Sequence, residues 1–233
     1  PAGQIAMMPY EGRYRIAIFR DFDAAMGVGQ DALLKTLEEP ASTSVLILLA
    51  RSLAPILATI TSRSQVFRLR PVSIDTIRRA LIDRGTDEKL AALAAALSGG
   101  RPGWAINALE DTALFDARSG ALDLLEKLLK ENRARRFLTA EDLAKDKDAL
   151  RTLLELWLSY WRDLVLISEN AGTPLTNIDR NAGLRALADT LTPELAFAAL
   201  RATADMLKLL DTNASARHGL EIMFLDYPGL SRA

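Results

Sequence analysis

The hydrophobic pattern of this chain of 233 residues changes at Pro71, and this change constrains the fold more than any other feature. Before Pro71, short apolar runs alternate with segments of helical periodicity. Strands are predicted at residues 15–19, 45–50 and 65–69, and helices at residues 30–39 and 53–60. Because residues 45–50 are nearly all apolar, we expect that strand to be covered on both faces. Strands that alternate with helices imply a parallel sheet, so this part is predicted to be the back half of an α/β domain.

After Pro71, every segment with a clear pattern is helical. Ser73 is a suitable N-cap for a helix through Ile82, and residues 88–97 are rich in alanine and leucine. Further helices are predicted from residue 104, at residues 122–129, at residues 150–165, and at residues 193–210 and 214–225. We therefore expect a small helical domain and a larger helical bundle after the α/β part.

The composition excludes several familiar kinds of site. Twenty-nine basic and thirty acidic residues give a net charge of −1, so no global positive field gathers nucleic acid. The absence of cysteine excludes disulfides, cysteine-ligated zinc and thiol catalysis. His218 is the lone histidine, which leaves little material for a histidine metal site or a Ser-His-Asp triad, and we expect it to be structural.

No membrane span or targeting signal is visible in the sequence. The longest apolar runs are far shorter than the ~20 residues that cross a bilayer. The first four residues, PAGQ, lack an initiator Met and a basic-then-apolar signal pattern, and resemble the middle of a longer polypeptide. We expect a cytoplasmic protein without membrane contacts.

The 233 residues contain no phosphate-binding loop of the type in which backbone amides and a lysine converge on phosphates. The glycine clusters at residues 27–29 and 99–103 do not fit that motif and are predicted to be loops. Hydrolysing NTPases also need an acidic pair at a strand end, for Mg²⁺ and for water. Here Arg20 and Asp21 follow the first predicted strand, and the positive charge opposes Mg²⁺ binding. ATP hydrolysis is therefore disfavoured.

An aromatic cluster occurs in the long helical segment. Trp157, Tyr160 and Trp161 have helical spacing, so they are expected to lie on one face. We interpret this face as core or subunit interface rather than as a platform on which bases stack.

A local basic patch is also predicted. It comprises Lys127, Lys130, Arg133, Arg135 and Arg136. Basic residues near the end of a helix are usually solvated, so we expect this patch to be solvated, with contact to phosphate or to an acidic partner as the alternative.

The turn at residues 61–65 carries the remaining candidate, Arg63. On composition alone, Arg63 is an ordinary surface arginine. However, a planar and permanently charged guanidinium on a short turn can stabilise a phosphoryl-transfer transition state in a neighbouring subunit.

Three ordered segments resemble the bacterial clamp-loader AAA+ subunits. They are residues 31–40 (DALLKTLEEP), residues 45–50 (VLILLA) and residues 59–65 (TITSRSQ). The family pattern runs NALLKTLEEP, an apolar sensor-1 strand, and TILSRCQ, so that Ser64 stands where the family has cysteine. The resemblance extends over nearly the whole chain.

Details of the resemblance favour the delta prime subunits of DNA polymerase III over the ATP-hydrolysing tau/gamma subunits. Arg20 and Asp21 replace the Walker B acidic pair, and Arg51 stands at the sensor-1 position. Gly103 falls at about the position of the sensor-2 arginine, in a segment similar to SGGxPGxAL. Residues 213–221 are similar to the collar signature NxxxRLxLE, with histidine in place of the usual leucine.

The resemblance implies three domains. Residues 1–70 would be the C-terminal part of an AAA+ α/β domain, residues 71–116 a helical lid, and residues 117–233 a helical collar that assembles subunits into a ring-like pentamer. Arg63, beside Ser62, would be an arginine finger offered in trans to ATP on the adjacent tau/gamma subunit.

The resemblance also implies partners and cofactors. This subunit would have no intrinsic activity and would serve the polymerase III holoenzyme, a nucleotidyltransferase complex. Its partners would be the delta and tau/gamma subunits directly, and the sliding clamp and primed DNA through the complex. ATP and Mg²⁺ would be bound by neighbours, and zinc only by a preceding segment with a degenerate P-loop and four cysteines.

Two alternatives remain open at this point. An ATP-hydrolysing clamp-loader subunit would require an intact P-loop before Pro1. A helical nucleic-acid-binding module would use the basic patch around residues 133–136 and would bind DNA with a steep salt dependence.

Overall fold

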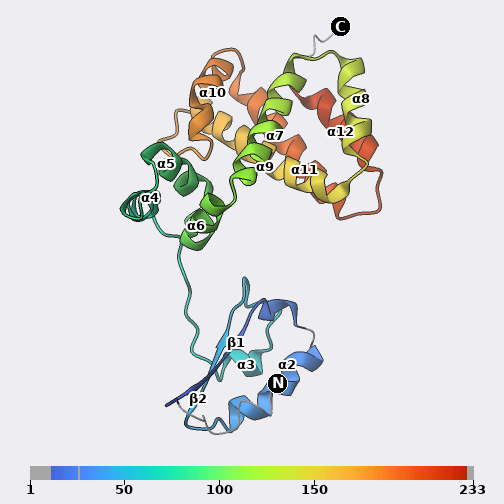
Figure 1. Ribbon diagram of the computed structural model, residues 1–233. Coiled ribbons are helices and arrows are strands. Elements are labelled where there is room, and N and C mark those ends of the chain that lie inside the picture. The colour runs from blue at the N-terminus through green and yellow to red at the C-terminus, as the bar shows by residue number, and fades with distance from the viewer. Residues whose placement is uncertain (1–11, 26, 230–233) are drawn as a thin grey trace. The chain divides into compact units, whose positions relative to one another are not determined.

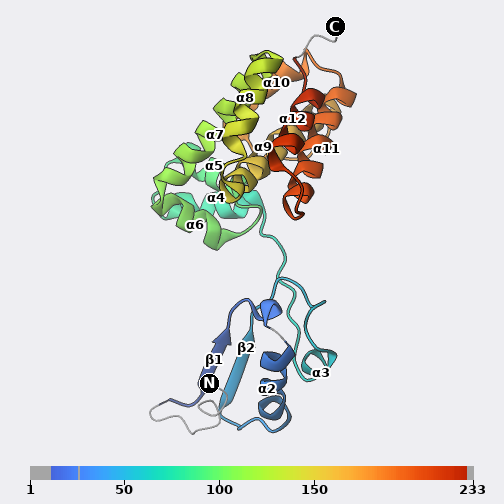
Figure 2. The ribbon, with the colours of Figure 1, turned by 90° about the vertical axis from the view of Figure 1, so that its right-hand side faces the viewer.

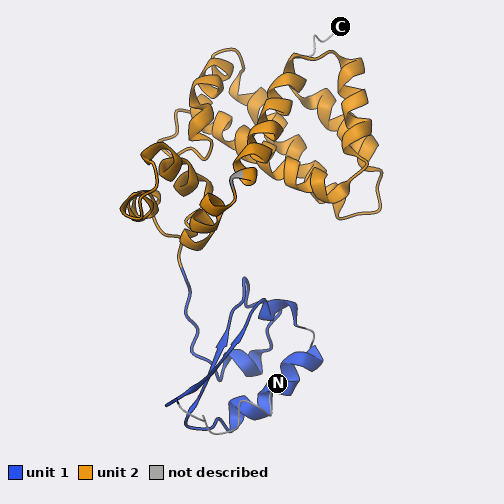
Figure 3. Ribbon diagram, viewed as in Figure 1, with its two compact units in different colours: residues 1–69 blue, residues 70–233 orange. Residues whose placement is uncertain are grey.

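The computed structural model describes residues 12–25 and 27–229 (Figure 1, with a second view in Figure 2). The chain divides into two compact units, Pro1–Leu69 and Arg70–Ala233, which Figure 3 colours separately. The architecture is mostly helical, with one small parallel sheet in the first unit.

The first unit is built on two parallel strands. β1 (Arg15–Phe19) pairs in parallel with β2 (Ser44–Leu48), and α2 (Gly27–Glu38) lies between them in the sequence. The 3-10 helix η1 (Phe22–Ala24) follows β1, and α3 (Ala58–Thr61) follows β2. Phe22 from η1, Leu33 from α2 and Ile60 from α3 form the core on one face of the strands. The predicted parallel pair with a helical crossover is therefore present.

The sheet differs from the prediction in its coverage. Leu46 and Leu48 pack against the core, but Val45 and Ile47 on the other face of β2 are more than one-third exposed. Ile16 and Ile18 of β1 are 60% exposed. The prediction of a strand covered on both faces is wrong for the described residues, because the described helices of this unit cover a single face.

Three predicted elements of the first unit also need correction. Residues 27–29 belong to α2 rather than to a loop, so this helix begins three residues before the predicted start at residue 30. Residues 53–57 are not helical, because the Gln30 side chain engages the backbone of this segment and replaces helical hydrogen bonds. Residues 65–69 form no strand, since an alternating pattern does not itself supply a neighbouring strand, and Phe67 and Leu69 are largely exposed.

The second unit consists of helices throughout. They are α4 (Ile74–Asp83), α5 (Glu88–Leu97), α6 (Pro102–Glu110), α7 (Thr112–Lys130), α8 (Arg133–Leu143), α9 (Lys147–Ser168), η2 (Ile178–Arg180), α10 (Asn181–Ala188), α11 (Pro193–Leu210) and α12 (Ala216–Asp226). Ser73 caps α4, as predicted, by accepting a hydrogen bond from the Thr76 amide.

Two hydrophobic cores lie within this unit. A small core joins α4, α5 and α6 and is rich in alanine, which lets the helices approach closely. A larger core joins α7 to α12. The predicted lid–collar boundary at residue 116 lies inside α7, which is continuous from Thr112 to Lys130. The division into lid and collar remains a prediction.

The aromatic residues of α9 form the centre of the larger core. Trp157, Tyr160 and Trp161 are at most 1% exposed, and the Trp161 and Tyr227 rings lie 5.1 Å apart in an edge-on arrangement. The Trp157 indole N–H donates to the Ala121 carbonyl at 2.8 Å. The core interpretation of this cluster is confirmed, and a base-stacking role is excluded by burial.

Candidate functional site

Arg63 follows the short helix α3, on the turn where the sequence places it. Its Nη1 donates to the Thr59 carbonyl at 3.1 Å and to the Ser62 hydroxyl at 3.5 Å. Its Nη2 forms an ion pair with Glu38 Oε1 at 3.1 Å. The Arg63 side chain keeps 40% of its surface exposed, so the guanidinium is anchored within its own unit but still open to solvent.

Ser62 belongs to the same turn. Its hydroxyl donates to the Thr59 carbonyl at 3.1 Å, so this carbonyl accepts from both Ser62 and Arg63. A carbonyl oxygen has two lone pairs and can accept both bonds. The structure therefore gives Ser62 a local role, which is to close the last turn of α3 and to contact the guanidinium.

Gln30 fixes the segment that leads into this turn, and the sequence analysis missed it. The buried side-chain amide donates to the Ala25 and Pro55 carbonyls, each at 3.0 Å, and accepts from the Leu57 amide at 2.9 Å. Gln30 lies three residues before the buried Leu33, so helical periodicity would have placed it on the inner face of α2.

The end of β1 brings two of the predicted positions together. Asp21 adopts a left-handed conformation (φ 49°), and its carboxylate pairs with Arg51 Nη2 at 3.3 Å. The Arg51 backbone amide donates to Asp23 at 3.3 Å. Both side chains of the Asp21–Arg51 pair are largely exposed. Arg20 is exposed at the same strand end.

This strand end is poorly suited to a metal ion. The Asp21 carboxylate already faces a cation, and a second positive charge opposes Mg²⁺. Within residues 12–25 and 27–229, no three or more His, Cys, Asp or Glu side chains are grouped in a way that could hold a metal.

Gly103 belongs to the second unit, near the start of α6. A Cβ at this position would meet no atom within 4 Å, so the backbone has room for an added methyl group. Residues 99–101 lie outside the helices, as predicted, and the Gly100 amide donates to the Ser98 hydroxyl at 3.1 Å. The loop prediction is wrong for residues 102–103, which belong to α6, so this helix begins two residues before the predicted start. The close approach of Gly100 to Pro71 explains why glycine is needed there.

The predicted basic patch is only partly solvated. Lys127, Lys130, Arg133 and Arg135 are exposed, but Arg136 is fully buried. Its guanidinium donates to the carbonyls of Phe224, Tyr227 and Pro228, at 2.9, 3.2 and 2.7 Å. Arg136 is therefore a structural tie between α8 and the end of α12, and the nucleic-acid interpretation loses one of its cations.

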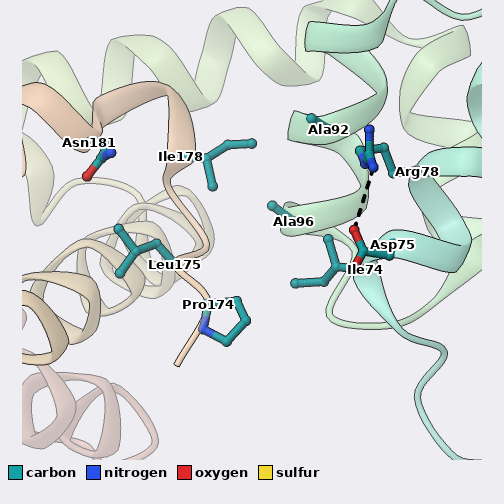
Figure 4. A pocket seen from close by; sticks show the side chains of 9 residues that line it. All are labelled: Ile74, Asp75, Arg78, Ala92, Ala96, Pro174, Leu175, Ile178 and Asn181. Carbon is teal, nitrogen blue, oxygen red and sulfur yellow. Dashed lines mark ion pairs between the residues drawn. The ribbon is translucent and has the colours of Figure 1, made fainter. Parts of the chain in front are cut away.

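The second unit also contains a pocket of about 280 Å³ that sequence reasoning did not anticipate (Figure 4). Residues of α4 and α5 form one wall, with Arg78 paired to Asp75 at 3.7 Å and to Glu88 at 3.2 Å. Pro174, Leu175 and other residues of the segment 174–181 form the opposite wall. None of the predicted site residues lines it.

His218 is exposed on α12, and its backbone amide donates to the Ser215 hydroxyl at 3.4 Å as part of the helix cap.

In the part of the chain that the structure describes, we find no helix with the length and hydrophobicity that a bilayer crossing requires.

Comparison with known proteins finds a match to a family model and similarity to solved structures. Residues 2–73, about the N-terminal third of the chain, match the family model described as DNA polymerase III, delta subunit. Among solved structures, the Bacillus subtilis DNA clamp loader delta protein is similar with a TM-score of 0.34 and 13% sequence identity, over 96% of this chain and 80% of that chain. No curated protein matches the chain. The family match includes both α2 and the Arg63 turn, and it supports the clamp-loader resemblance of this segment.

Proposed function

We propose that this chain is a delta prime-type subunit of the DNA polymerase III clamp loader. In this role it supports the ATP-dependent loading of the sliding clamp onto primed DNA without hydrolysing ATP itself. The family match over residues 2–73 supports a clamp-loader subunit, and the residues of the first unit support the finer assignment.

The observation that carries the proposal is the state of Arg63. A guanidinium has five N–H donors, and its fork geometry suits the oxygens of a phosphate. Arg63 uses Nη1 and one side of Nη2 within its own unit and remains 40% exposed. An arginine finger needs this combination, because it must be held by its own subunit and yet reach the γ-phosphate bound by the next one.

The assignment as a non-hydrolysing subunit is supported by the strand end. A hydrolysing subunit needs an acidic pair there for Mg²⁺ and for the attacking water. Arg20 and Arg51 place positive charge there instead, and Arg51 already pairs with the Asp21 carboxylate. ATP and Mg²⁺ would therefore be bound by a neighbouring tau/gamma subunit, and Arg63 would stabilise the charge that develops during transfer.

The helical part would provide assembly. We assign residues 71–116 to the lid and residues 117–233 to the collar, through which the chain would contact the delta and tau/gamma subunits. The separate alanine-rich core of α4 to α6 is consistent with a small lid. Contact with the clamp and with DNA would be made by the complex.

The test is the variant Arg63→Ala in the reconstituted clamp loader, with Arg68→Ala as an exposed control five residues away. We expect normal assembly, and a loss of hydrolysis at the adjacent ATP site that approaches the ~10³–10⁵-fold effect of arginine fingers elsewhere. Arg63→Lys keeps the charge but not the fork and is expected to remain impaired. An assembled Arg63→Ala complex with normal DNA-stimulated ATPase would remove Arg63 from the mechanism.

A further inference from the structure

The acidic partner of Arg63 is the last residue of α2. Glu38 Oε1 lies 3.1 Å from Arg63 Nη2, while the Thr59 carbonyl lies 3.1 Å from Nη1. These anchors come from two different helices, α2 and α3. A planar group that is held at two of its nitrogens has a fixed plane as well as a fixed position.

The free donors of Arg63 follow from these contacts. Nη1 has two acceptors, Thr59 and Ser62, for its two N–H groups. Nη2 forms an ion pair with the Glu38 carboxylate, which can engage one of its two N–H groups. Nε–H and at least one Nη2–H therefore have no acceptor among the described residues, and these donors are available to an oxyanion from outside the chain.

The electrostatic setting explains why the ion pair orients Arg63 more than it stabilises the fold. Glu38 and Arg63 expose 53% and 40% of their side chains, and ion pairs with such exposure contribute little to the free energy of unfolding. Glu38 also stands at the C-terminal end of α2, where a carboxylate is unfavourable next to the negative end of the helix dipole. A nearby guanidinium offsets that cost.

We infer that Glu38 is a positioning residue for Arg63: it holds the guanidinium in one plane, so that the remaining donors face outward to the phosphate of a nucleotide on the adjacent subunit. The inference rests on the proposed function of Arg63 and deepens it. It assigns to Glu38 an effect on the rate of transfer, because a mobile finger reaches the productive geometry less often.

The experiment uses the reconstituted clamp loader with primed DNA and ATP. We expect Glu38→Ala to lower the kcat of DNA-stimulated hydrolysis about three- to tenfold, with the KM for ATP and the unfolding midpoint of the chain unchanged. Glu38→Gln keeps a side-chain oxygen of the same reach but loses the charge of the ion pair with Nη2, so an intermediate rate is expected. Glu39→Ala is the matched control, since Glu39 is the exposed neighbour and forms no ion pair with the described residues.

A second measurement does not depend on ATP hydrolysis. The order parameter of the Arg63 Nε–H bond, measured by 15N NMR relaxation in the full chain alone, should be lower in Glu38→Ala than in the unchanged protein and in Glu39→Ala. Equal order parameters would show that the pair does not hold Arg63 in solution and would overturn the inference.

The possible failures can be told apart. A complex that is slowed by Arg63→Ala but runs at full speed, or faster, with Glu38→Ala would overturn the positioning role alone. No effect of Arg63→Ala would instead overturn the proposed function. A Glu38→Ala/Arg63→Ala double variant should be no slower than Arg63→Ala, because Glu38 acts only through Arg63.

Discussion

The Arg136 guanidinium donates a hydrogen bond of 2.7 Å to the backbone carbonyl of Pro228, which lies just beyond the end of α12. The same group donates to the carbonyls of Phe224 and Tyr227. Carbonyls at the end of a helix lack partners within the helix, so they must find donors elsewhere. One buried side chain of α8 thus satisfies the end of another helix, far away in the sequence.

Replacement of Arg136 should therefore destabilise the second unit. We expect Arg136→Ala to lower the free energy of unfolding by about 3 kcal/mol or more, because it leaves several buried carbonyls without donors and removes packing. Urea unfolding followed by far-UV circular dichroism measures the change. Arg135→Ala, at an exposed position of the same helix, should stay within about 0.5 kcal/mol. Equal effects of the two variants would contradict this assignment.

A second prediction concerns Gln30. In Gln30→Ala the Leu57 amide and the Pro55 carbonyl lose their partner, which should cost about 1–2 kcal/mol and loosen the segment before α3. Hydrogen–deuterium exchange of residues 53–63 should become faster. Asp31→Asn changes the exposed neighbour and should leave this exchange as it is. Unchanged protection in Gln30→Ala would mean that the α3 segment is held by its core contacts alone.

A third prediction compares two glycines of the cluster at residues 99–103. Gly100 has φ +79°, and a Cβ on it would lie 2.4 Å from Pro71 Cβ and 2.9 Å from Pro71 Cα. A proline ring cannot turn away, so Gly100→Ala should cost about 2–4 kcal/mol. Gly103→Ala meets no atom within 4 Å and lies in the first turn of α6, so it should be neutral or stabilise by up to about 1 kcal/mol. The unfolding temperatures of both variants test this comparison. An unchanged unfolding temperature in Gly100→Ala would show that the contact with Pro71 can relax.

Local sequence signals predicted several helices of the second unit well, but they did not predict α8 or α10. The helix expected at residues 88–97 is α5 with the same bounds, and the one expected at residues 193–210 is α11. In these segments the apolar period and the helix-breaking residues at the ends are contained in the sequence of the segment itself.

Features that depend on distant residues were not predictable in the same way. Arg136 belongs to a stretch of basic residues whose sequence gives no hint of carbonyls almost ninety positions later. The segment at residues 65–69 has the side chains of a strand but no neighbour to pair with among the described residues. Periodicity reports which face is apolar, and it does not report what lies against that face.

In the candidate site, too, the local turn was predictable from the sequence and its distant contacts were not. The turn that carries Arg63 was predicted from its sequence, and the structure adds its partner Glu38, which comes from a separate helix. The contact between Asp21 and Arg51 likewise joins the ends of two different strands. Both contacts result from the crossover between β1 and β2, which brings these residues together in space.

The two contacts that α2 makes with the segment that carries Arg63 have a mechanical consequence. Gln30 bonds to the chain before α3, and Glu38 pairs with Arg63 after it. Their separation of eight positions corresponds to about 12 Å of helix. A helix of this length is stiff, so it transmits a tilt without absorbing it. Any rotation of α2 relative to the strands would therefore displace the Arg63 guanidinium as well.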